Sequence, residues 1–287
     1  MNLSKYRLLT RPEQSLFGLP FIFSAVVLSL VGQKWSEILI FSKLIWILPA
    51  FLSARISGMA FNQLIDRDID ARNPRTEERV IPKGRVSPFQ AAWIAWGALA
   101  LFLLCCSRIN LLCLLFAPFA AFLLVIYSYM KRISSLCHFV LGMIHFLSPF
   151  MTWMVLRDEI SWPPFFLGLS ALFLIAGNDI LYAVQDYSFD LQEGLHTILT
   201  RFGIKKGLIV ARGAHFLACG ALFAMGLSMH FGPLYYGALP CVVGAFIYMH
   251  TRFVAGDERR FFLSNASISA IILGLNILGA LTWPGLL

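Results

Sequence analysis

Charged residues are scarce in this chain: only 13% of its 287 residues are Asp, Glu, Lys or Arg, whereas 59% are hydrophobic. A soluble domain of this size needs far more polar surface, so the composition indicates a polytopic membrane protein. A convincing signal peptide is also missing. The first apolar run, 16–31, is long, no small-residue cleavage site follows it, and further runs come after it. We therefore expect this run to form the first membrane helix.

Cysteine pairs with metal-binding spacing are absent too. None of the six cysteines forms a C-x-x-C motif, which argues against a zinc site and against a disulfide framework. Cysteine in such positions usually serves as a small packing residue. Linkers and low-complexity tracts are absent as well, so we expect one integral-membrane domain over 1–287.

Long apolar runs, in contrast, recur along the whole chain. Each is about 18 residues or longer, which is enough to cross a bilayer as an α-helix. We expect an all-α fold with nine membrane spans, near residues 15–33, 40–62, 89–107, 110–129, 137–156, 164–186, 207–228, 232–251 and 264–283.

The basic residues are divided unequally between the two sides of these spans. Loops on the side of the N-terminus hold 17 Lys and Arg residues, and loops on the opposite side hold four. Because cytoplasmic loops are enriched in Lys and Arg, we expect the N-terminus to face the cytoplasm. The net charge of +8 belongs to this face. Anionic lipid headgroups attract such charge, so it implies no nucleic-acid partner.

Acidic residues number only fifteen, yet six of them fall into two clusters. The clusters consist of Asn62, Asp66, Asp68 and Asp70, and of Asp179, Tyr182, Asp186 and Asp190. Each cluster closes a long apolar run, where a carboxylate is costly unless something compensates its charge. Such groups are therefore candidates for function.

The two clusters also occupy matching places in the chain. Asp66 and Asp186 are 120 residues apart, and each lies at the cytoplasmic end of an even-numbered span. This spacing predicts two related four-helix halves, about 15–129 and 137–251, followed by a ninth helix at 264–283.

Helical spacing places most members of each cluster on one face. Residues four apart share a face, which aligns Asn62, Asp66 and Asp70, whereas Asp68 points elsewhere and is expected to be a solvated partner of Arg67 or Arg72. The second cluster steps by 3, 4 and 4 residues and forms a similar stripe.

If the two helices face each other, their carboxylates line one polar cavity. Mg²⁺ suits such a site, since it is commonly held by a few carboxylates together with substrate phosphate. Interfacial salt bridges are the structural alternative.

Four stretches resemble the UbiA superfamily of intramembrane prenyltransferases. The stretch 62–87, NQLIDRDIDARNPRTEERVIPKGRVS, resembles the first signature of that family, NxxxDxxxD with a basic loop. The stretch 179–203, DILYAVQDYSFDLQEGLHTILTRFG, is similar to the second, DxxYxxxDxxxD with a Gly-rich turn. YSYMKR at 127–132 resembles the end of the family's fourth helix, and RPEQSLFGLP at 11–20 resembles its N-terminal start.

The likeness covers almost the whole chain, and nine helices is the family's count. Two positions depart from it. Many members carry Asp where this chain has Gln63, and many 4-hydroxybenzoate enzymes have Lys followed by Ser or Thr where it has His196 and Thr197. These departures concern the acceptor more than the chemistry.

The resemblance implies Mg²⁺-dependent transfer of a polyprenyl group from its diphosphate to an aromatic ring. It implies that two Mg²⁺ ions bridging the diphosphate are held by Asn62, Asp66, Asp70, Asp186 and Asp190, with Asp179 supporting the second ion. Asp66, Asp70, Asp186 and Asp190 are also implied to be catalytic. The residues implied to contact the diphosphate or substrate are Arg72 or Arg75, Tyr127, Lys131, Arg132 and Tyr182.

Four further polar residues have two interpretations each. Arg55, within the second span, is expected to bind the acceptor's carboxylate or the diphosphate, the alternative being a pair with an aspartate that keeps the helix insertable. For His196, in the second long loop, contact with the substrate and a position away from it are equally expected. For His145 and His215, within apolar spans, an interhelical hydrogen bond is favoured over catalysis.

The resulting hypothesis is an enzyme of quinone biosynthesis in the bacterial inner membrane, which prenylates an aromatic acid such as 4-hydroxybenzoate on the cytoplasmic side. A menaquinone-pathway enzyme with a hydroxynaphthoate acceptor is the alternative, because of Leu195, His196 and Thr197. A two-repeat transporter is an alternative of another class. Helices broken by Gly or Pro at matching mid-span positions would favour it, and the sequence shows no such matched pair. A structural scaffold would leave the aspartates dispensable.

Overall fold

The computed structural model describes residues 4–33 and 37–286, and every regular element in these ranges is a helix. The elements of the first part are α1 Ser4–Thr10, η1 Pro12–Phe17, α2 Leu19–Leu30, α3 Glu37–Ile65, α4 Arg67–Asp70, α5 Pro88–Ser107, α6 Leu111–Ile133 and α7 Cys137–Arg157. Those of the second part are α8 Trp162–Tyr182, η2 Ala183–Asp186, α9 Tyr187–Gln192, α10 Ile198–Ser228, α11 Pro233–Arg252, α12 Glu258–Leu281 and η3 Pro284–Leu286. The all-α prediction is confirmed.

The predicted number of nine crossings is not confirmed. Within the described residues, seven helices are long and apolar enough to cross a membrane, and the bent pair Ser4–Phe17 and Leu19–Leu30 would make an eighth. α11 has 20 residues but is not among them. Individual boundaries were better predicted, since the expected spans 89–107 and 137–156 correspond to α5 and α7.

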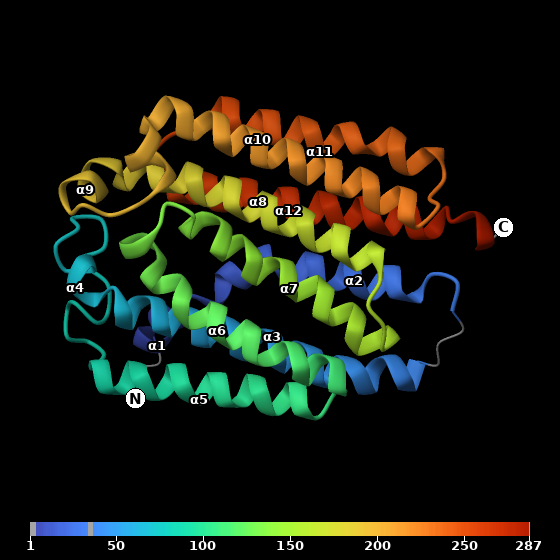
Figure 1. The fold of residues 1–287 in the computed structure, drawn as a ribbon, viewed down its shortest axis with the longest axis horizontal. Coiled ribbons are helices and arrows are strands. Elements are labelled where there is room, and N and C mark those ends of the chain that lie inside the picture. Colours follow the sequence, from blue (N-terminus) through green and yellow to red (C-terminus); the bar gives the residue numbers. More distant parts are fainter. Residues whose placement is uncertain (1–3, 34–36, 287) are drawn as a thin grey trace.

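The long helices run side by side along the length of the molecule (Figure 1). α10, α11 and α12 lie along one side, α3, α5 and α6 along the other, and α7 and α8 between them. The most extensive contacts are those of α8 with α10, of α8 with α7 and of α3 with α5. The short elements α1, α4 and α9 gather at one end, opposite the C-terminus.

Glycines allow the central helices to approach closely. A Cβ added at Gly142 of α7 would overlap the backbone carbonyl of Leu172 on α8. At Gly168 of α8 it would overlap the ring of Phe146 on α7. Small residues at a helix–helix contact let backbones pack against each other, which is how helices associate in lipid, where hydrophobic burial contributes little. The α7–α8 contact therefore joins the two sides of the bundle.

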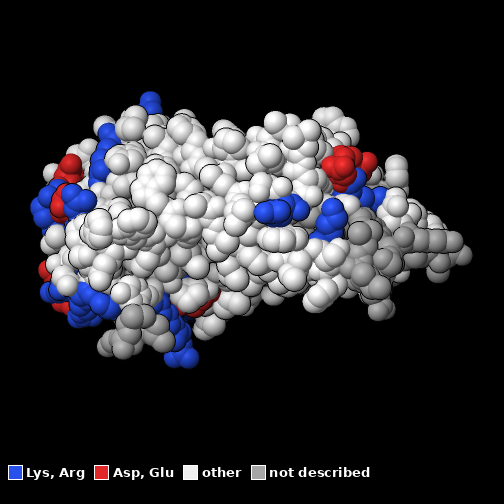
Figure 2. All heavy atoms as spheres, turned by 90° about the horizontal axis from the view of Figure 1, so that it is seen from below, with Lys and Arg blue, Asp and Glu red and all other residues white. Residues whose placement is uncertain are grey.

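Charged side chains concentrate at the end that carries α4 and α9. Figure 2 shows most of the Lys and Arg side chains of the visible face at this end, with a smaller group toward the opposite end. Two helices that begin here have capping boxes, in which Ser87 pairs with Gln90 at α5 and Thr197 with Thr200 at α10. These caps satisfy backbone donors that would otherwise be unpaired at the membrane boundary.

Candidate functional site

The two acidic clusters lie where α3 and α8 end. The helical repeat continues through the first cluster, since the Asp66 amide donates to the Asn62 carbonyl over 3.0 Å and the Asp70 amide to the Asp66 carbonyl over 2.8 Å. The second cluster does not form the continuous α-helical stripe that its spacing predicts. α8 ends at Tyr182, and the chain passes through the 3₁₀ turn η2 before α9 begins at Tyr187. Aspartates four residues apart therefore do not share one straight helical face here.

Asp66 is buried, with 2% of its surface exposed, and it faces two cations from the end of α6. Its Oδ2 lies 3.0 Å from Lys131 Nζ, and its Oδ1 lies 3.0 Å from Arg132 Nη2. Burial raises the pKa of the Asp66 carboxyl above its ordinary value, while Lys131 opposes that rise. The sequence-predicted residues Asp66, Lys131 and Arg132 thus meet in the structure.

Asp70 has a partner that the sequence motifs did not identify. Arg79 Nη1 donates to Asp70 Oδ2 over 2.7 Å, and Asp70 is 3% exposed. Arg79 lies in the loop after α4, where no periodicity reveals which side chain turns inward. Asp68, in contrast, is largely exposed and lies 3.5 Å from Arg67, which confirms that it is a solvated partner.

Arg75 connects the loop of the first cluster to the second cluster. Its Nη2 lies 2.6 Å from Asp186 Oδ2, and its Nε donates to Asp186 Oδ1 over 2.8 Å. Asn73 also donates to Asp186 Oδ1, over 2.9 Å. Burial lowers the pKa of Arg75, but the hydrogen bond to Asp186 together with the nearby Tyr182, Asp186 and Glu258 outweighs burial, so the pKa is raised above its ordinary value. The residues of the two clusters are therefore brought to the same end of the bundle.

Two further contacts hold this loop across the gap between the clusters. Arg75 Nη1 lies 3.1 Å from the Tyr182 hydroxyl, which donates to Glu258 Oε1 of α12 over 2.9 Å. Arg72 Nη2 lies 2.7 Å from Glu193 Oε2, just beyond α9. Glu258 and Glu193 were not predicted as site residues, because each is a lone acid outside the two motifs.

Asp179 lies deeper than the other acids and has a histidine partner. Its Oδ2 lies 2.7 Å from Nδ1 of His138, which is 2% exposed at the start of α7. His138 lies outside both acidic motifs and was not predicted as a site residue. The available signal was an imidazole inside an apolar run, directly after the basic end of the preceding span.

A cavity of about 640 Å³ extends from the acidic end into the bundle. Its rim includes Asn62, Arg79, Tyr182 and Glu258, and Asp179 lines its wall. Its lining residues on α3 run from Asn62 back to Ile47, which at 1.5 Å per residue corresponds to a depth of about 22 Å. Below the rim the wall is mainly apolar, formed by α3, α5, α6, α7 and the connection between α5 and α6 at Phe51, Phe102, Cys106, Ile109, Cys113, Leu124, Met151 and Val155.

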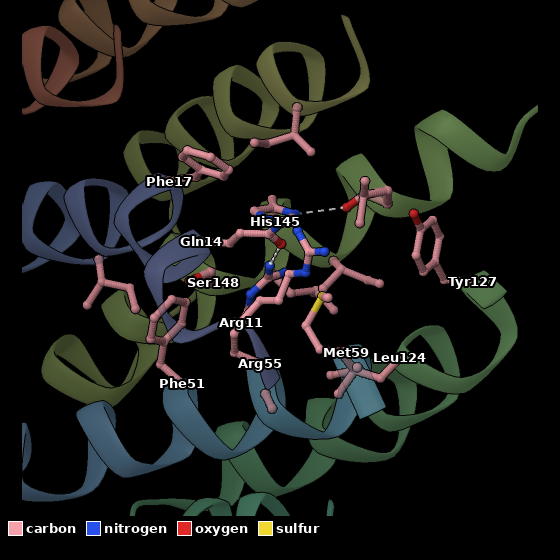
Figure 3. A pocket seen from close by; sticks show the side chains of 18 of the residues that line it. Arg11, Gln14, Phe17, Phe51, Arg55, Met59, Leu124, Tyr127, His145 and Ser148 are labelled. Atoms are coloured by element: carbon pink, nitrogen blue, oxygen red, sulfur yellow. Dashed lines mark hydrogen bonds between the residues drawn. The ribbon is translucent and has the colours of Figure 1, made fainter. Parts of the chain in front are cut away.

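Two of the predicted binding residues enter this cavity below its rim. Figure 3 shows Arg55 and Tyr127 with their side chains directed into it. Arg55 Nη2 donates to Gln14 Oε1 of η1, whereas its buried Nε has no hydrogen-bond partner among the described residues. The alternative that Arg55 pairs with an aspartate is wrong for this structure, in which its partner is an amide.

His196 and Gln63, where the chain departs from the family pattern, lie outside the cavity lining. His196 is exposed, and its amide donates to the Lys131 carbonyl over 2.6 Å. Gln63 is 1% exposed and donates to the carbonyls of Leu8 and Leu9. Gln63 therefore holds α1 against α3 and is not directed at the acids.

The two predicted interhelical histidines differ. His215 on α10 lies 2.8 Å from His250 Nε2 on α11, as expected. His145 on α7 instead pairs with the Leu141 carbonyl of its own helix and lines the cavity. The interhelical prediction is wrong for His145.

The donor set suits a hard divalent cation. The acidic end offers carboxylate oxygens and the side-chain amide of Asn62, which donates to Asp66 Oδ2 over 3.2 Å. No three His, Cys, Asp or Glu side chains of the described residues lie close enough to hold a metal on their own. Mg²⁺ is usually bound by one or two carboxylates with substrate phosphate oxygens, so this arrangement fits Mg²⁺ arriving with a phosphorylated ligand.

Comparison with known proteins identifies relatives over almost the full length. The sequence profile of the UbiA prenyltransferase family matches residues 19–266. A 4-hydroxybenzoate octaprenyltransferase of Vibrio campbellii (strain ATCC BAA-1116) is 27% identical over 276 residues, which is 93% of each chain. One of Francisella tularensis subsp. novicida (strain U112) is 26% identical over 188 residues, covering 65% of this chain and 66% of the relative.

Solved structures share the fold. The apo structure of a UbiA homolog from Aeropyrum pernix K1 superposes with a TM-score of 0.81 at 25% identity, covering 93% of this chain and 98% of that one. A UbiA homolog from Archaeoglobus fulgidus bound to GPP and Mg²⁺ gives a TM-score of 0.72 at 20% identity, covering 96% and 99%.

Proposed function

The chain belongs to the UbiA prenyltransferase family, and from that premise we propose that it transfers a polyprenyl group from a polyprenyl diphosphate to an aromatic acid such as 4-hydroxybenzoate. The protein is an integral membrane prenyltransferase. The aromatic acceptor, quinone biosynthesis as the pathway, the bacterial inner membrane and the cytoplasmic orientation belong to the proposal. The names of its relatives and the basic end of the bundle support them.

One observation carries the proposal. Buried or half-buried carboxylates of two distant motifs lie at the end of the bundle where a mainly apolar cavity opens, and Asp66, Asp70 and Asp186 each face a basic side chain there. Asn62 of the first motif and Asp179 of the second line the cavity itself. A polyprenyl diphosphate has the same division, with a highly charged head and an apolar tail. The acidic end suits the head with its cations, and the apolar wall suits the tail.

The metal-binding roles are assigned to the acids at the mouth. We assign Mg²⁺ ligation to Asn62, Asp66, Asp70, Asp186 and Asp190, with Asp179 in support. When bound, Mg²⁺ would neutralise charge on the diphosphate oxygens as the allylic C–O bond breaks. Within the described residues, Asp190 is the acid of this set that has no side-chain ion pair or hydrogen bond, although it is only 8% exposed.

The basic side chains at the mouth would exchange partners when the donor binds. Arg75, Lys131 and Arg132 hold carboxylates in this structure and can turn to diphosphate oxygens once these carboxylates ligate cations. Charge-assisted hydrogen bonds from Arg are well suited to phosphate. Because the charge on the diphosphate rises as the bond breaks, donors placed there stabilise the transition state more than the bound substrate.

Arg55 would bind the carboxylate of the acceptor. Its unpaired Nε lies below the level of the aspartates, inside the cavity, where a buried donor without a partner is costly. An acid bound there would present its ring toward the donor's allylic carbon. The surrounding side chains would exclude water and so protect an allylic cation from hydrolysis. The ring proton would leave to a nearby carboxylate or to the diphosphate as aromaticity returns.

We further propose that the chain is a single domain with two related halves, since α3 and α8 hold equivalent motifs at the same end of the bundle.

Product analysis tests the function directly. The purified protein in lipid would be given Mg²⁺, prenyl diphosphates of several lengths, and 4-hydroxybenzoate or a hydroxynaphthoate, followed by mass spectrometry. The expected product is the acid with one hydrogen replaced by the prenyl group. Asp186→Asn should lose the product and the solvated control Asp68→Asn should keep it. Product from the naphthoate alone would assign the menaquinone pathway, and no product from any acid would overturn the proposal.

A further inference from the structure

His145 is directed into the cavity with only one of its ring nitrogens in use. Its Nδ1 lies 3.0 Å from the carbonyl oxygen of Leu141, four residues earlier on α7. Nε2 makes no hydrogen bond to any described residue, and Figure 3 shows the ring in the cavity that Arg55 also enters. An apolar span does not require a histidine here, and the mechanism above does not use it.

The contact with Leu141 determines the tautomer. A carbonyl oxygen only accepts hydrogen bonds, so Nδ1 must carry the proton that it donates. In a neutral imidazole, Nε2 is then an acceptor with a free lone pair. Burial among apolar helices disfavours a second proton, and the Arg55 cation in the same cavity acts in the same direction while Asp179 opposes it, so the neutral ring is favoured. The cavity therefore contains a fixed acceptor atom.

Other polar atoms along the cavity also lack partners. Arg55 Nε is a buried donor without a partner, and the buried Ser148 Oγ, three residues after His145, has none among the described residues. Residues three apart on a helix lie on the same face, so Ser148 follows His145 along the cavity wall. Buried polar atoms are nearly always satisfied, so Arg55 Nε and Ser148 Oγ indicate a polar ligand, and the acceptor atom of His145 favours one that also carries a hydroxyl donor.

We propose that His145 Nε2 accepts a hydrogen bond from the ring hydroxyl of the acceptor while Arg55 binds its carboxylate. This inference rests on the proposed function and adds a specificity-determining residue to it. The bond would select aromatic acids with a free hydroxyl over those in which it is blocked. By attracting the hydroxyl proton, the bond would also leave more electron density on the hydroxyl oxygen. That oxygen donates density to the ring, which makes the ring carbon a better nucleophile. His145 forms no covalent bond in this scheme.

The test compares two acceptors that differ by one hydrogen-bond donor. 4-Methoxybenzoate has an activated ring and the same carboxylate as 4-hydroxybenzoate, but its oxygen cannot donate. Wild-type protein, His145→Phe and His145→Gln would be assayed for kcat/KM with both acids. Binding of a prenyl diphosphate to each variant would show that it is folded. His215→Phe is the matched control, since it removes a buried histidine outside the cavity lining.

Wild type and His215→Phe should prefer the hydroxy acid by about 5- to 100-fold, the range expected when a buried acceptor loses its partner. His145→Phe should abolish the preference by losing activity on the hydroxy acid only, and His145→Gln, which keeps an acceptor oxygen, should restore part of it. An unchanged preference in His145→Phe would overturn the inference while leaving the proposed function intact. A wild type that prenylates neither this pair nor any other acid would instead overturn the proposed function.

Discussion

The guanidinium of Arg75 contacts both carboxylate oxygens of Asp186, with 2.6 Å between Nη2 and Oδ2, although the two residues are 111 positions apart. This pair joins the loop after one acidic motif to the other motif. It also compensates the negative charge of a half-buried acid. Removing one partner of such a pair leaves an uncompensated charge, which is strongly destabilising. The basic side chains therefore have a structural role before they have a catalytic one.

Replacing Arg55 by Gln should weaken acceptor binding more than donor binding. The loss of a charge-assisted hydrogen bond predicts a rise of about 10- to 100-fold in the acceptor's KM, with little change in the KM of the prenyl diphosphate. Steady-state kinetics with each substrate varied in turn would measure this. Arg212→Gln is the control, because Arg212 is exposed on α10 outside the cavity lining. Equal effects on both substrates would contradict the assignment.

Removal of divalent cations should stop the reaction without unfolding the protein. The acids have basic partners in this structure, so the fold does not need a metal to compensate them. We expect exhaustive chelation to abolish transfer, Mg²⁺ to restore it, and the circular dichroism spectrum to stay constant. Transfer that survives chelation would show that the acids do not work through a cation.

The bridge between Arg72 and Glu193 should protect the loop 71–87 in a pH-dependent way. The hydrogen bond from Arg72 lowers the pKa of Glu193 from its ordinary value of 4.5. The bridge is therefore intact at neutral pH and is lost as the pH falls through that lowered value. At pH 7, Glu193→Gln should show faster hydrogen exchange in this loop than wild type, and the difference should vanish well below pH 4.5. A difference that persists at low pH would exclude the bridge as its cause.

Gly177→Ala should destabilise the contact of α8 with α10. A Cβ at Gly177 would overlap the His215 ring and lie 3.0 Å from the Ala211 carbonyl, so one helix must shift. Overpacking of this kind costs about 1–3 kcal/mol, which thermal unfolding in detergent would detect. Gly220→Ala on α10 is the control, because nothing lies within 4 Å of its added Cβ, and it should be neutral or stabilising. Equal stability of the two variants would contradict the packing argument.

The sequence alone predicted the helices well because each depends on a local signal. The span 89–107 begins after a capping box at Ser87 and ends where Ser107, Arg108 and Asn110 interrupt the apolar run, so both of its ends follow from local sequence. The number of crossings did not follow, since α2 has only 12 residues and α11, which holds a single charged residue, falls short of the other long helices in hydropathy. The break after Tyr182 was also missed, because aspartates at helical spacing do not show where an α-helix changes to a 3₁₀ turn.

The sequence predicted the aspartates of the two motifs but not all of the side chains that pair with them. Spacing identified Asp66 and Asp186, since their positions in the chain repeat. It could not identify Arg79, Glu258 or His138, because each reaches its partner through the tertiary fold or an irregular loop. The direction of His145 was likewise inaccessible, as a histidine in an apolar run gives no sign of which helix face borders a cavity.

The most direct test of the account is Mg²⁺-dependent binding of an unreactive prenyl thiodiphosphate to Asp66→Asn and to Asp186→Asn. Each variant alters one motif, and both motifs are proposed to bind the same diphosphate. Each substitution alone should therefore weaken binding at least about 10-fold, the scale of a lost charge-assisted contact, while Asp68→Asn should bind as wild type does. Wild-type affinity in either of the two site variants would contradict the claim that the motifs form one site.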